Sequence, residues 1–79
     1  MAYFRVDGYD GWESKYIHVC ETDDARVAVD EAREYLEAHP ECYIGIEYWR
    51  SRMHCEDNRR CNKRFNINEF TNAFCRDKA

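Results

Sequence analysis

The sequence predicts an α+β fold in which a small antiparallel sheet of three to four strands carries two helices, in the order ββαβ(β)α. Two kinds of pattern indicate this fold. Apolar and polar residues alternate in two runs near the N-terminus and again around residue 45, whereas segments 23–38 and 67–76 repeat apolar residues at three- and four-residue steps. The 79 residues fit one domain, 1–79, with a core of modest size.

A β-hairpin is expected at the start of the sequence. Residues 3–7 place Phe4 and Val6 on one face, and the glycine-bearing loop 8–11 precedes a second alternating run, 12–20. The period-two rule assigns the second strand one face with Ile17 and Val19, and another with Tyr16, His18 and Cys20.

A helix is expected over residues 23–38. The preceding segment 21–24, ETDD, offers Thr or Asp oxygens that can cap the open N–H groups of a first turn. Pro40 ends the helix just after His39, because proline lacks an N–H and clashes with the preceding turn. The apolar stripe consists of Ala25, Ala28, Val29, Ala32, Tyr35 and Leu36.

The C-terminal half predicts one more strand and one more helix. Residues 42–50 alternate as a third strand, and residues 51–64 form either a long loop or another hairpin whose second strand ends near Phe65. Asn66 and Glu69 match a capping box, which predicts a terminal helix over 67–76.

The sequence favours an intracellular protein. Its start has no basic region followed by an apolar stretch, and the longest later apolar run is residues 42–46. We therefore expect neither a signal peptide nor a membrane span. Because five cysteines is an odd count and no secretion signal is seen, we expect reduced thiols in the cytoplasm, with one disulfide pairing left open.

The cysteines and histidines have poor spacing for a metal site. Cys55 and Cys61 are separated by five residues, whereas zinc-binding pairs usually lie two to four apart. His54 is next to Cys55 in sequence only, and no serine-nucleophile motif or glycine-rich phosphate loop occurs. We expect no metal, no cofactor and no catalytic activity. The side chains weighed as zinc ligands are His54, Cys55, Cys61 and Cys75, with Cys42 as a further candidate.

Charge is divided unevenly along the chain, whose net charge is −4. Residues 1–49 hold twelve acids and four bases, and residues 50–79 hold eight bases and four acids. On the predicted helix an acidic stripe surrounds Val27 with no basic neighbour, which indicates either a solvated face or a surface that binds a basic groove. The acidic stripe consists of Asp24, Glu31 and Glu34.

The basic segment 50–64 lies between Trp49 and Phe65 and combines cations with aromatic side chains, which can hold phosphates and stack bases. The pI near 5.3 and the lack of a known nucleic-acid-binding motif make pairing with the acidic half the plainer use. The cations of this segment are Arg50, Arg52, Arg59, Arg60, Lys63 and Arg64.

The sheet face opposite the aliphatic one is rich in aromatic and charged side chains, which are common at interfaces. An alternative is that the terminal helix packs on this face and turns its aromatics into a second, minor core. The residues assigned to this face are Tyr3, Arg5, Tyr16, His18, Tyr43, Glu47 and Trp49.

In size, acidity and ββαβ order, the chain resembles the small inhibitors that phages and other mobile elements encode, such as anti-CRISPR and anti-restriction proteins. The resemblance implies a non-catalytic protein-binding module in the cytoplasm of a bacterial host cell, and it carries over no site. Our leading hypothesis is that the domain binds a basic, nucleic-acid-handling host protein and occludes its nucleic-acid site. The acidic stripe would supply charge, and Tyr9 and Trp12 of the hairpin would supply anchors.

Other partners are ranked below a host protein. The alternative function is a zinc-stabilised nucleic-acid-binding module that uses the basic segment 50–64, with Cys55 and Cys61 among the ligands. A homodimer through the aromatic face or an unpaired strand edge is left open. We expect no membrane partner.

Overall fold

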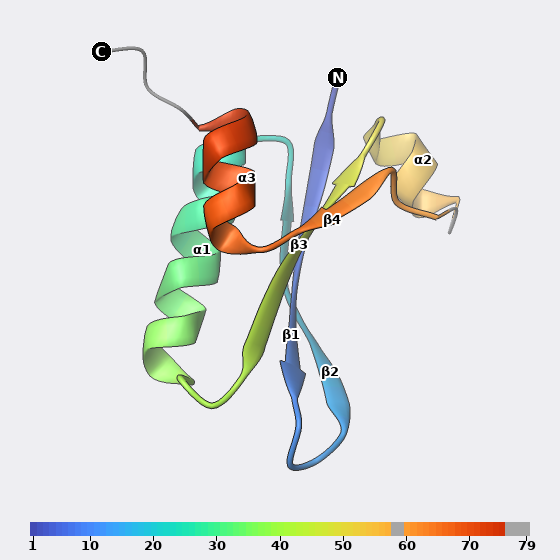
Figure 1. The fold of residues 1–79 in the computed structure, drawn as a ribbon. Coiled ribbons are helices and arrows are strands. Elements are labelled where there is room, and N and C mark those ends of the chain that lie inside the picture. Colours follow the sequence, from blue (N-terminus) through green and yellow to red (C-terminus); the bar gives the residue numbers. More distant parts are fainter. Residues whose placement is uncertain (58–59, 76–79) are drawn as a thin grey trace.

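The computed structural model describes residues 1–57 and 60–75, and it has an α+β fold with a four-stranded antiparallel sheet (Figure 1). This confirms the predicted fold class. The elements in chain order are β1 (Tyr3–Asp10), β2 (Lys15–Thr22), α1 (Ala25–Ala38), β3 (Tyr43–Trp49), α2 (Arg52–Glu56), β4 (Lys63–Phe65) and α3 (Ile67–Phe74).

The molecule has two layers. The strands lie in the order β2-β1-β3-β4, and each neighbouring pair is antiparallel. Helix α1 packs over β2, β1 and β3, while α3 packs over β3 and β4 and lies beside α1 (Figure 1). The Cα atoms extend over 37 × 35 × 15 Å, which fits one sheet covered by one layer of helices.

The core lies between the sheet and these two helices. Phe70 of α3 is fully buried, and its ring centroid lies 5.0 Å from that of Phe4 and 5.9 Å from that of Phe65. Burial of a phenylalanine side chain contributes about 1.5–3 kcal/mol, so this cluster is a large share of what a short chain gains on folding. The buried cluster consists of Phe4, Val6, Ala28, Val29, Ala32, Ile46, Phe65 and Phe70.

The position of α3 corrects one alternative. One alternative from the sequence was that the terminal helix covers the aromatic sheet face. In the structure, α3 packs on the aliphatic face beside α1. The reason is that Phe4 and Phe65 present an aromatic surface there that Phe70 completes. We call the opposite side the open face. Its central residues are Arg5, Asp7, Tyr9, Tyr16, His18, Tyr43 and Glu47.

A β-bulge corrects a second expectation. Val6 pairs with Cys20, but the next residue of β1, Asp7, pairs with His18, so Val19 is the extra residue of β2. The bulge moves Cys20 to the helix side, where it packs against the buried cluster. The sequence-based assignment of Cys20 to the face of His18 is therefore wrong, whereas Tyr16 and His18 lie on the open face as predicted.

Segment 51–64 contains a short helix that was not predicted. Ser51 caps α2 by accepting a hydrogen bond from the backbone N of His54 at 3.1 Å, and the His54 ring lies 5.5 Å from that of Trp49. Trp49 is consequently only 6 % exposed, whereas Tyr16 is 69 % exposed. Strand β4 then ends at Phe65, in agreement with the hairpin alternative. Arg59 lies outside the described residues.

The terminal helix confirms the predicted capping box. The Asn66 side chain accepts from the backbone N of Glu69 at 2.8 Å, and the Glu69 carboxylate accepts from the backbone N of Asn66 at 3.2 Å. Helix α3 ends at Phe74, with Cys75 at its C-cap. Residue 76, the last residue of the predicted helix, lies outside the described residues.

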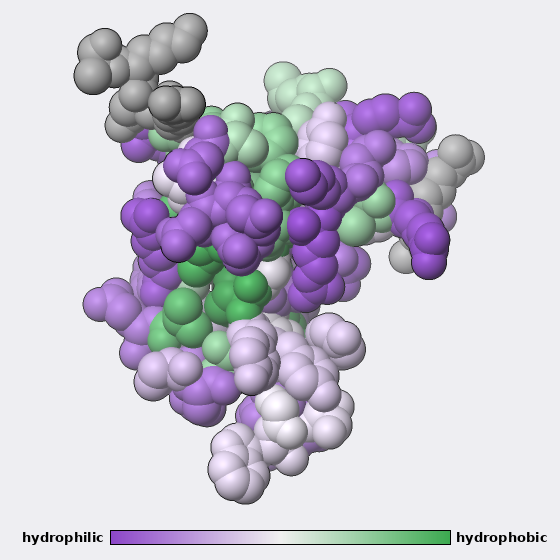
Figure 2. All heavy atoms as spheres, in the orientation of Figure 1, coloured by the Kyte–Doolittle hydropathy of each residue, from purple (hydrophilic) through white to green (hydrophobic). Residues whose placement is uncertain are grey.

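Within residues 1–57 and 60–75, no helix combines the length and the apolar content that crossing a bilayer requires. Figure 2 shows polar atoms over much of the helical layer, and the hairpin between β1 and β2 projects below it with intermediate hydropathy. The tip of this hairpin therefore reaches into solvent, whereas the rest of both hairpin strands belongs to the sheet.

We expect Asn66→Ala to lower the free energy of unfolding by about 1 kcal/mol, because the substitution removes the N-cap acceptor of α3. Urea unfolding followed by far-UV circular dichroism measures the loss. Asn72→Ala is the matched control, since Asn72 is exposed within the same helix. Equal unfolding midpoints for the two variants would contradict the assigned cap.

Candidate functional site

The acidic stripe lies on α1, but its three members have different roles. Asp24 is the N-cap residue, and its carboxylate accepts from the backbone N of Arg26 at 2.9 Å and from that of Val27 at 3.4 Å. Glu31 and Glu34 are exposed further along the helix. Val27, which the stripe surrounds, is 41 % exposed. The structure thus combines acidic and apolar groups on one flank of α1.

Glu31 and Glu34 face the edge of the sheet across a hollow of about 340 Å³. His18 and Val19 of β2 form the other side of this hollow, and Tyr35 of α1 also lines it. Strand β2 is the outermost strand, so its second edge is open within the described sheet. We call this region, made by Glu31, Glu34 and β2, the acidic flank.

The electrostatics of the acidic flank are visible at Cys20. Burial, reinforced by the negative charges of Glu31, Glu21 and Asp7, raises the pKa of the Cys20 thiol from 9.0 to about 11. Acids on α1, β2 and β1 therefore act together on one point of the edge strand. The thiol itself stays protonated at neutral pH.

The hairpin carries the two predicted aromatic anchors. The Asp10 carboxylate accepts from the backbone N of Trp12 at 2.9 Å and fixes the turn, and Trp12 is 90 % exposed at its tip. Tyr9 lies on the open face, where its ring contacts Tyr16 with a centroid distance of 4.9 Å. The structure therefore places these anchors at the end of the sheet and the acids on the helix flank.

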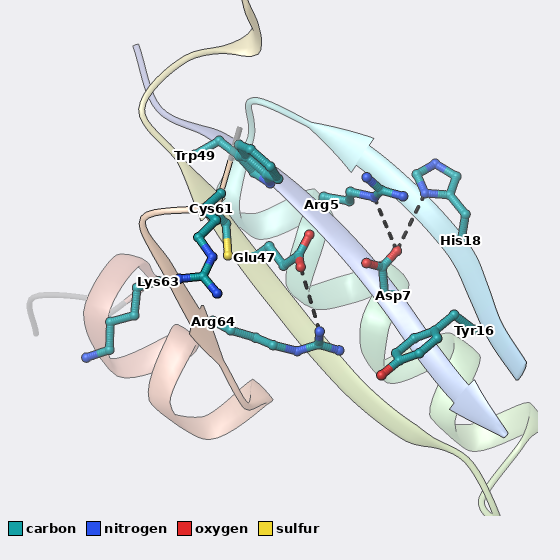
Figure 3. A pocket seen from close by; sticks show the side chains of 10 residues that line it. Arg5, Asp7, Tyr16, His18, Glu47, Trp49, Cys61, Lys63 and Arg64 are labelled. Atoms are coloured by element: carbon teal, nitrogen blue, oxygen red, sulfur yellow. Dashed lines mark ion pairs between the residues drawn. The ribbon is translucent and has the colours of Figure 1, made fainter. Parts of the chain in front are cut away.

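The open face is hollowed into a groove of about 790 Å³ (Figure 3). Its floor is formed by β1 and β3, its edges by β2 and by the segment that enters β4. Figure 3 shows Trp49 at one end of the groove and Tyr16 at the other. The lining residues are Arg5, Asp7, Tyr16, His18, Glu47, Trp49, Arg60, Cys61, Lys63 and Arg64.

Ion pairs cross the floor of this groove. Asp7, whose side chain is 12 % exposed, lies 3.4 Å from Arg5 Nε and 3.7 Å from His18 Nδ1. Glu47, 16 % exposed, lies 3.7 Å from Arg64 Nη1. Burial, and next the charge of Asp7, raise the pKa of Glu47, and the nearby cations Arg64 and Arg5 oppose that rise. The two carboxylates thus interact within one partly buried site.

Gly45 makes room for this arrangement. It lies on β3 opposite Asp7 in the register, and a Cβ atom there would overlap the Arg64 guanidinium, with Nη2 at only 2.7 Å. Arg64 can therefore reach from β4 across β3 towards the centre of the sheet. Any larger residue at position 45 would push it outward.

Two donors on the groove have no hydrogen-bond partner among the described residues. The indole N–H of Trp49 and the Nε of Arg5 are both buried, and neither meets an acceptor in hydrogen-bonding geometry. Trp49 Nε1 does approach the Glu47 carboxylate closely enough to help lower its pKa. Arg5 Nε is near Asp7, but only as an ion pair. Both donors are thus directed towards groups that line the groove.

The described residues give no support to a zinc site or a reactive cysteine. Among residues 1–57 and 60–75, no three His, Cys, Asp or Glu side chains gather where they could hold a metal ion. Cys55 and Cys61 are free thiols, and burial raises the pKa of both. Cys55 is 6 % exposed, so it lacks the access and the thiolate character that a nucleophile needs.

The sequence located the aromatic open face but not the groove. Its cations Arg60 and Arg64 were predicted only as part of the basic segment, because one sequence does not fix where β4 joins the sheet. Gly45 in the middle of a predicted strand was the available signal, since glycine inside a strand often marks a close approach by another group.

Comparison with protein-family models, with curated proteins and with solved structures finds no match to this chain.

We expect the rate of Cys20 alkylation by iodoacetamide to rise with pH towards a midpoint near 11, because only the thiolate reacts. Glu31→Gln should move the midpoint to lower pH and raise the rate at pH 9 about twofold or more, since it removes a negative charge that disfavours the thiolate. Mass spectrometry of proteolytic peptides separates Cys20 from the other cysteines.

Glu37→Gln provides the control on the same helix. Glu37 is exposed, and the charges that act on Cys20 in the described structure are Glu31, Glu21 and Asp7. A midpoint that stays unchanged in Glu31→Gln, or one that falls equally in Glu37→Gln, would show that the acidic flank does not act on Cys20 as described.

Proposed function

We propose that the domain is a non-catalytic protein-binding module that docks its acidic flank onto a basic, nucleic-acid-handling protein and occludes the nucleic-acid site of that protein. The single observation that carries the proposal is the hollow between α1 and the open edge of β2, which Glu31 and Glu34 line. The proposal places the domain in the cytoplasm of a bacterial host, as an inhibitor of the kind that phages and other mobile elements encode.

The charge of the acidic flank supports a basic partner. Glu31 and Glu34 are exposed, and the charges of Glu31 and Glu21 add to the effect of burial in raising the pKa of the neighbouring Cys20 thiol. A lysine or arginine side chain in the hollow would meet this negative field with little competition from the helix itself. Complementary charge of this kind speeds association and selects partners.

Apolar side chains beside the flank supply contact area. Val27 is 41 % exposed within the acidic stripe, and Trp12 is 90 % exposed at the hairpin tip. Exposed tryptophan is a frequent anchor at protein interfaces, where it fills a pocket of the partner. Strand β2 lies between α1 and the open face that carries Tyr9. A partner that binds along this edge would therefore contact both the acidic stripe and the predicted aromatic anchors.

The test is affinity capture from a bacterial lysate with the intact protein as bait, with and without nuclease treatment, at about 0.05 and 0.5 M salt. We expect a captured basic protein that is lost at the higher salt, where the Debye length falls to a few ångström and the acidic flank is screened. The double variant Glu31→Lys/Glu34→Lys should lose the same protein at both salt concentrations.

The matched control is Asp30→Lys/Glu37→Lys. It makes the same change of charge on the same helix, but at residues that stand on a neighbouring line with Arg26 and Arg33. Equal loss of the captured protein in both double variants would show an effect of net charge alone. Capture that vanishes on nuclease treatment would contradict the proposal.

A further inference from the structure

The groove on the open face is a second surface, separate from the acidic flank, and two buried donors on it lack an acceptor in good hydrogen-bond geometry. Trp49 is only 6 % exposed, and its indole N–H has no hydrogen-bond partner among the described residues. The buried Arg5 Nε is in the same condition. Each donor lies near a carboxylate, Trp49 Nε1 near Glu47 and Arg5 Nε near Asp7, but neither reaches good hydrogen-bond geometry. An oxygen atom of a ligand that accepts from these donors would therefore improve their hydrogen bonding.

The charge of the groove indicates that this ligand is an anion. Three arginines line the groove, Arg5, Arg60 and Arg64, against the two carboxylates of Asp7 and Glu47. The Lys63 ammonium lies outside the groove, over the Phe65 ring. Both carboxylates are already paired with arginines, Asp7 with Arg5 and Glu47 with Arg64. Arg60, which also lines the groove, adds a positive charge beyond these ion pairs.

A row of tyrosines continues the surface beyond the groove. Tyr9 pairs in register with Tyr16 on one side and with Tyr43 on the other, so the three side chains lie on the same face of neighbouring strands. Tyr16 is 69 % exposed and Tyr43 is 72 % exposed. Exposed aromatic rings beside a cationic groove are the combination that single-stranded nucleic acids use, with bases stacked on rings and phosphates on cations.

We propose that the open face binds single-stranded nucleic acid, with a phosphate in the groove near Trp49, Arg5 and Arg64 and with bases stacked on the tyrosine row. The six residue steps of β3 from Tyr43 to Trp49 span about 20 Å, which is longer than one nucleotide needs. A duplex is disfavoured because its bases are stacked inside and cannot reach the tyrosine rings. An acidic peptide would match the cations but would leave the tyrosine row unused.

This inference goes beyond the proposed protein-binding function and does not depend on it. It keeps the nucleic-acid part of the alternative suggested by the sequence, but it moves the site from the whole basic segment 50–64 to the sheet face and needs no zinc. The two activities use opposite sides of the edge strand β2, so each can fail while the other holds.

The experiment is fluorescence anisotropy of a fluorescein-labelled 12-nucleotide thymidine strand titrated with the full chain at several salt concentrations. We expect saturable binding. The logarithm of the association constant should fall linearly with the logarithm of the salt concentration, with a slope of about 0.7 for each phosphate contacted. In the variant Trp12→Phe, which keeps Trp49 as the one tryptophan of the chain, the unlabelled strand should change the Trp49 fluorescence.

Arg64→Gln and Tyr16→Ala test the two halves of the site. Arg64→Gln should weaken binding about fivefold or more and reduce the salt slope by about 0.7, because one phosphate contact is lost. Tyr16→Ala should weaken binding about fivefold or more with an unchanged salt slope, because stacking is not electrostatic. Arg52→Gln is the matched control, since Arg52 belongs to the basic segment but lies on α2, outside the groove, where it pairs with Glu56 at 3.0 Å.

Arg52→Gln should bind the strand within about twofold of the unmodified chain, and circular dichroism confirms that each variant is folded. The inference is overturned if no strand binding occurs at 50 mM salt, or if Arg52→Gln weakens binding as much as Arg64→Gln. The inference is also overturned if a hexaglutamate peptide displaces the labelled strand as well as an equal concentration of unlabelled strand does, because the site would then bind carboxylates.

Discussion

The packing of Phe70 against Phe4 and Phe65 is the contact on which the rest of this structure depends. It draws α3 onto the same side of the sheet as α1, so that both helices share one core and the sheet has a single covered face. Within residues 1–57 and 60–75, neither α1 nor α3 packs on the opposite, open face. The charged residues of the open face must therefore satisfy one another, which they do through the Asp7 and Glu47 ion pairs.

The second organising element is the edge strand β2. Its bulge at Val19 turns Cys20 towards the helices and leaves His18 on the open face, so the strand contributes to both surfaces. His18 lines the groove and also the hollow beside Glu31. The charges are also arranged differently on the two sides of β2. Glu31 and Glu34 line the hollow on the α1 flank, whereas Arg60 and Arg64 line the groove together with the carboxylates of Asp7 and Glu47.

The regular elements could be predicted because each has its own periodic signal: the two strands of the hairpin, α1 with its stop before Pro40, β3, and α3 with the Asn66 capping box. Three features could not. Helix α2 has five residues, too few to show a period. The bulge at Val19 inserts one residue without any change in composition, and the side of the sheet that α3 covers depends on Phe4 and Phe65, which are far apart in sequence. The groove was missed for the same reason, because Arg64 reaches Gly45 only through tertiary structure.

One small sheet thus separates the acidic flank from an arginine-lined groove with aromatic side chains. The most direct test is nuclear magnetic resonance of the ¹⁵N-labelled chain, titrated separately with a hexalysine peptide and with the thymidine strand. The account predicts that the peptide shifts amide signals around Glu31 and Glu34 and that the strand shifts those around Arg5, Gly45 and Arg64. Shifts in the same set of residues with both ligands would contradict it.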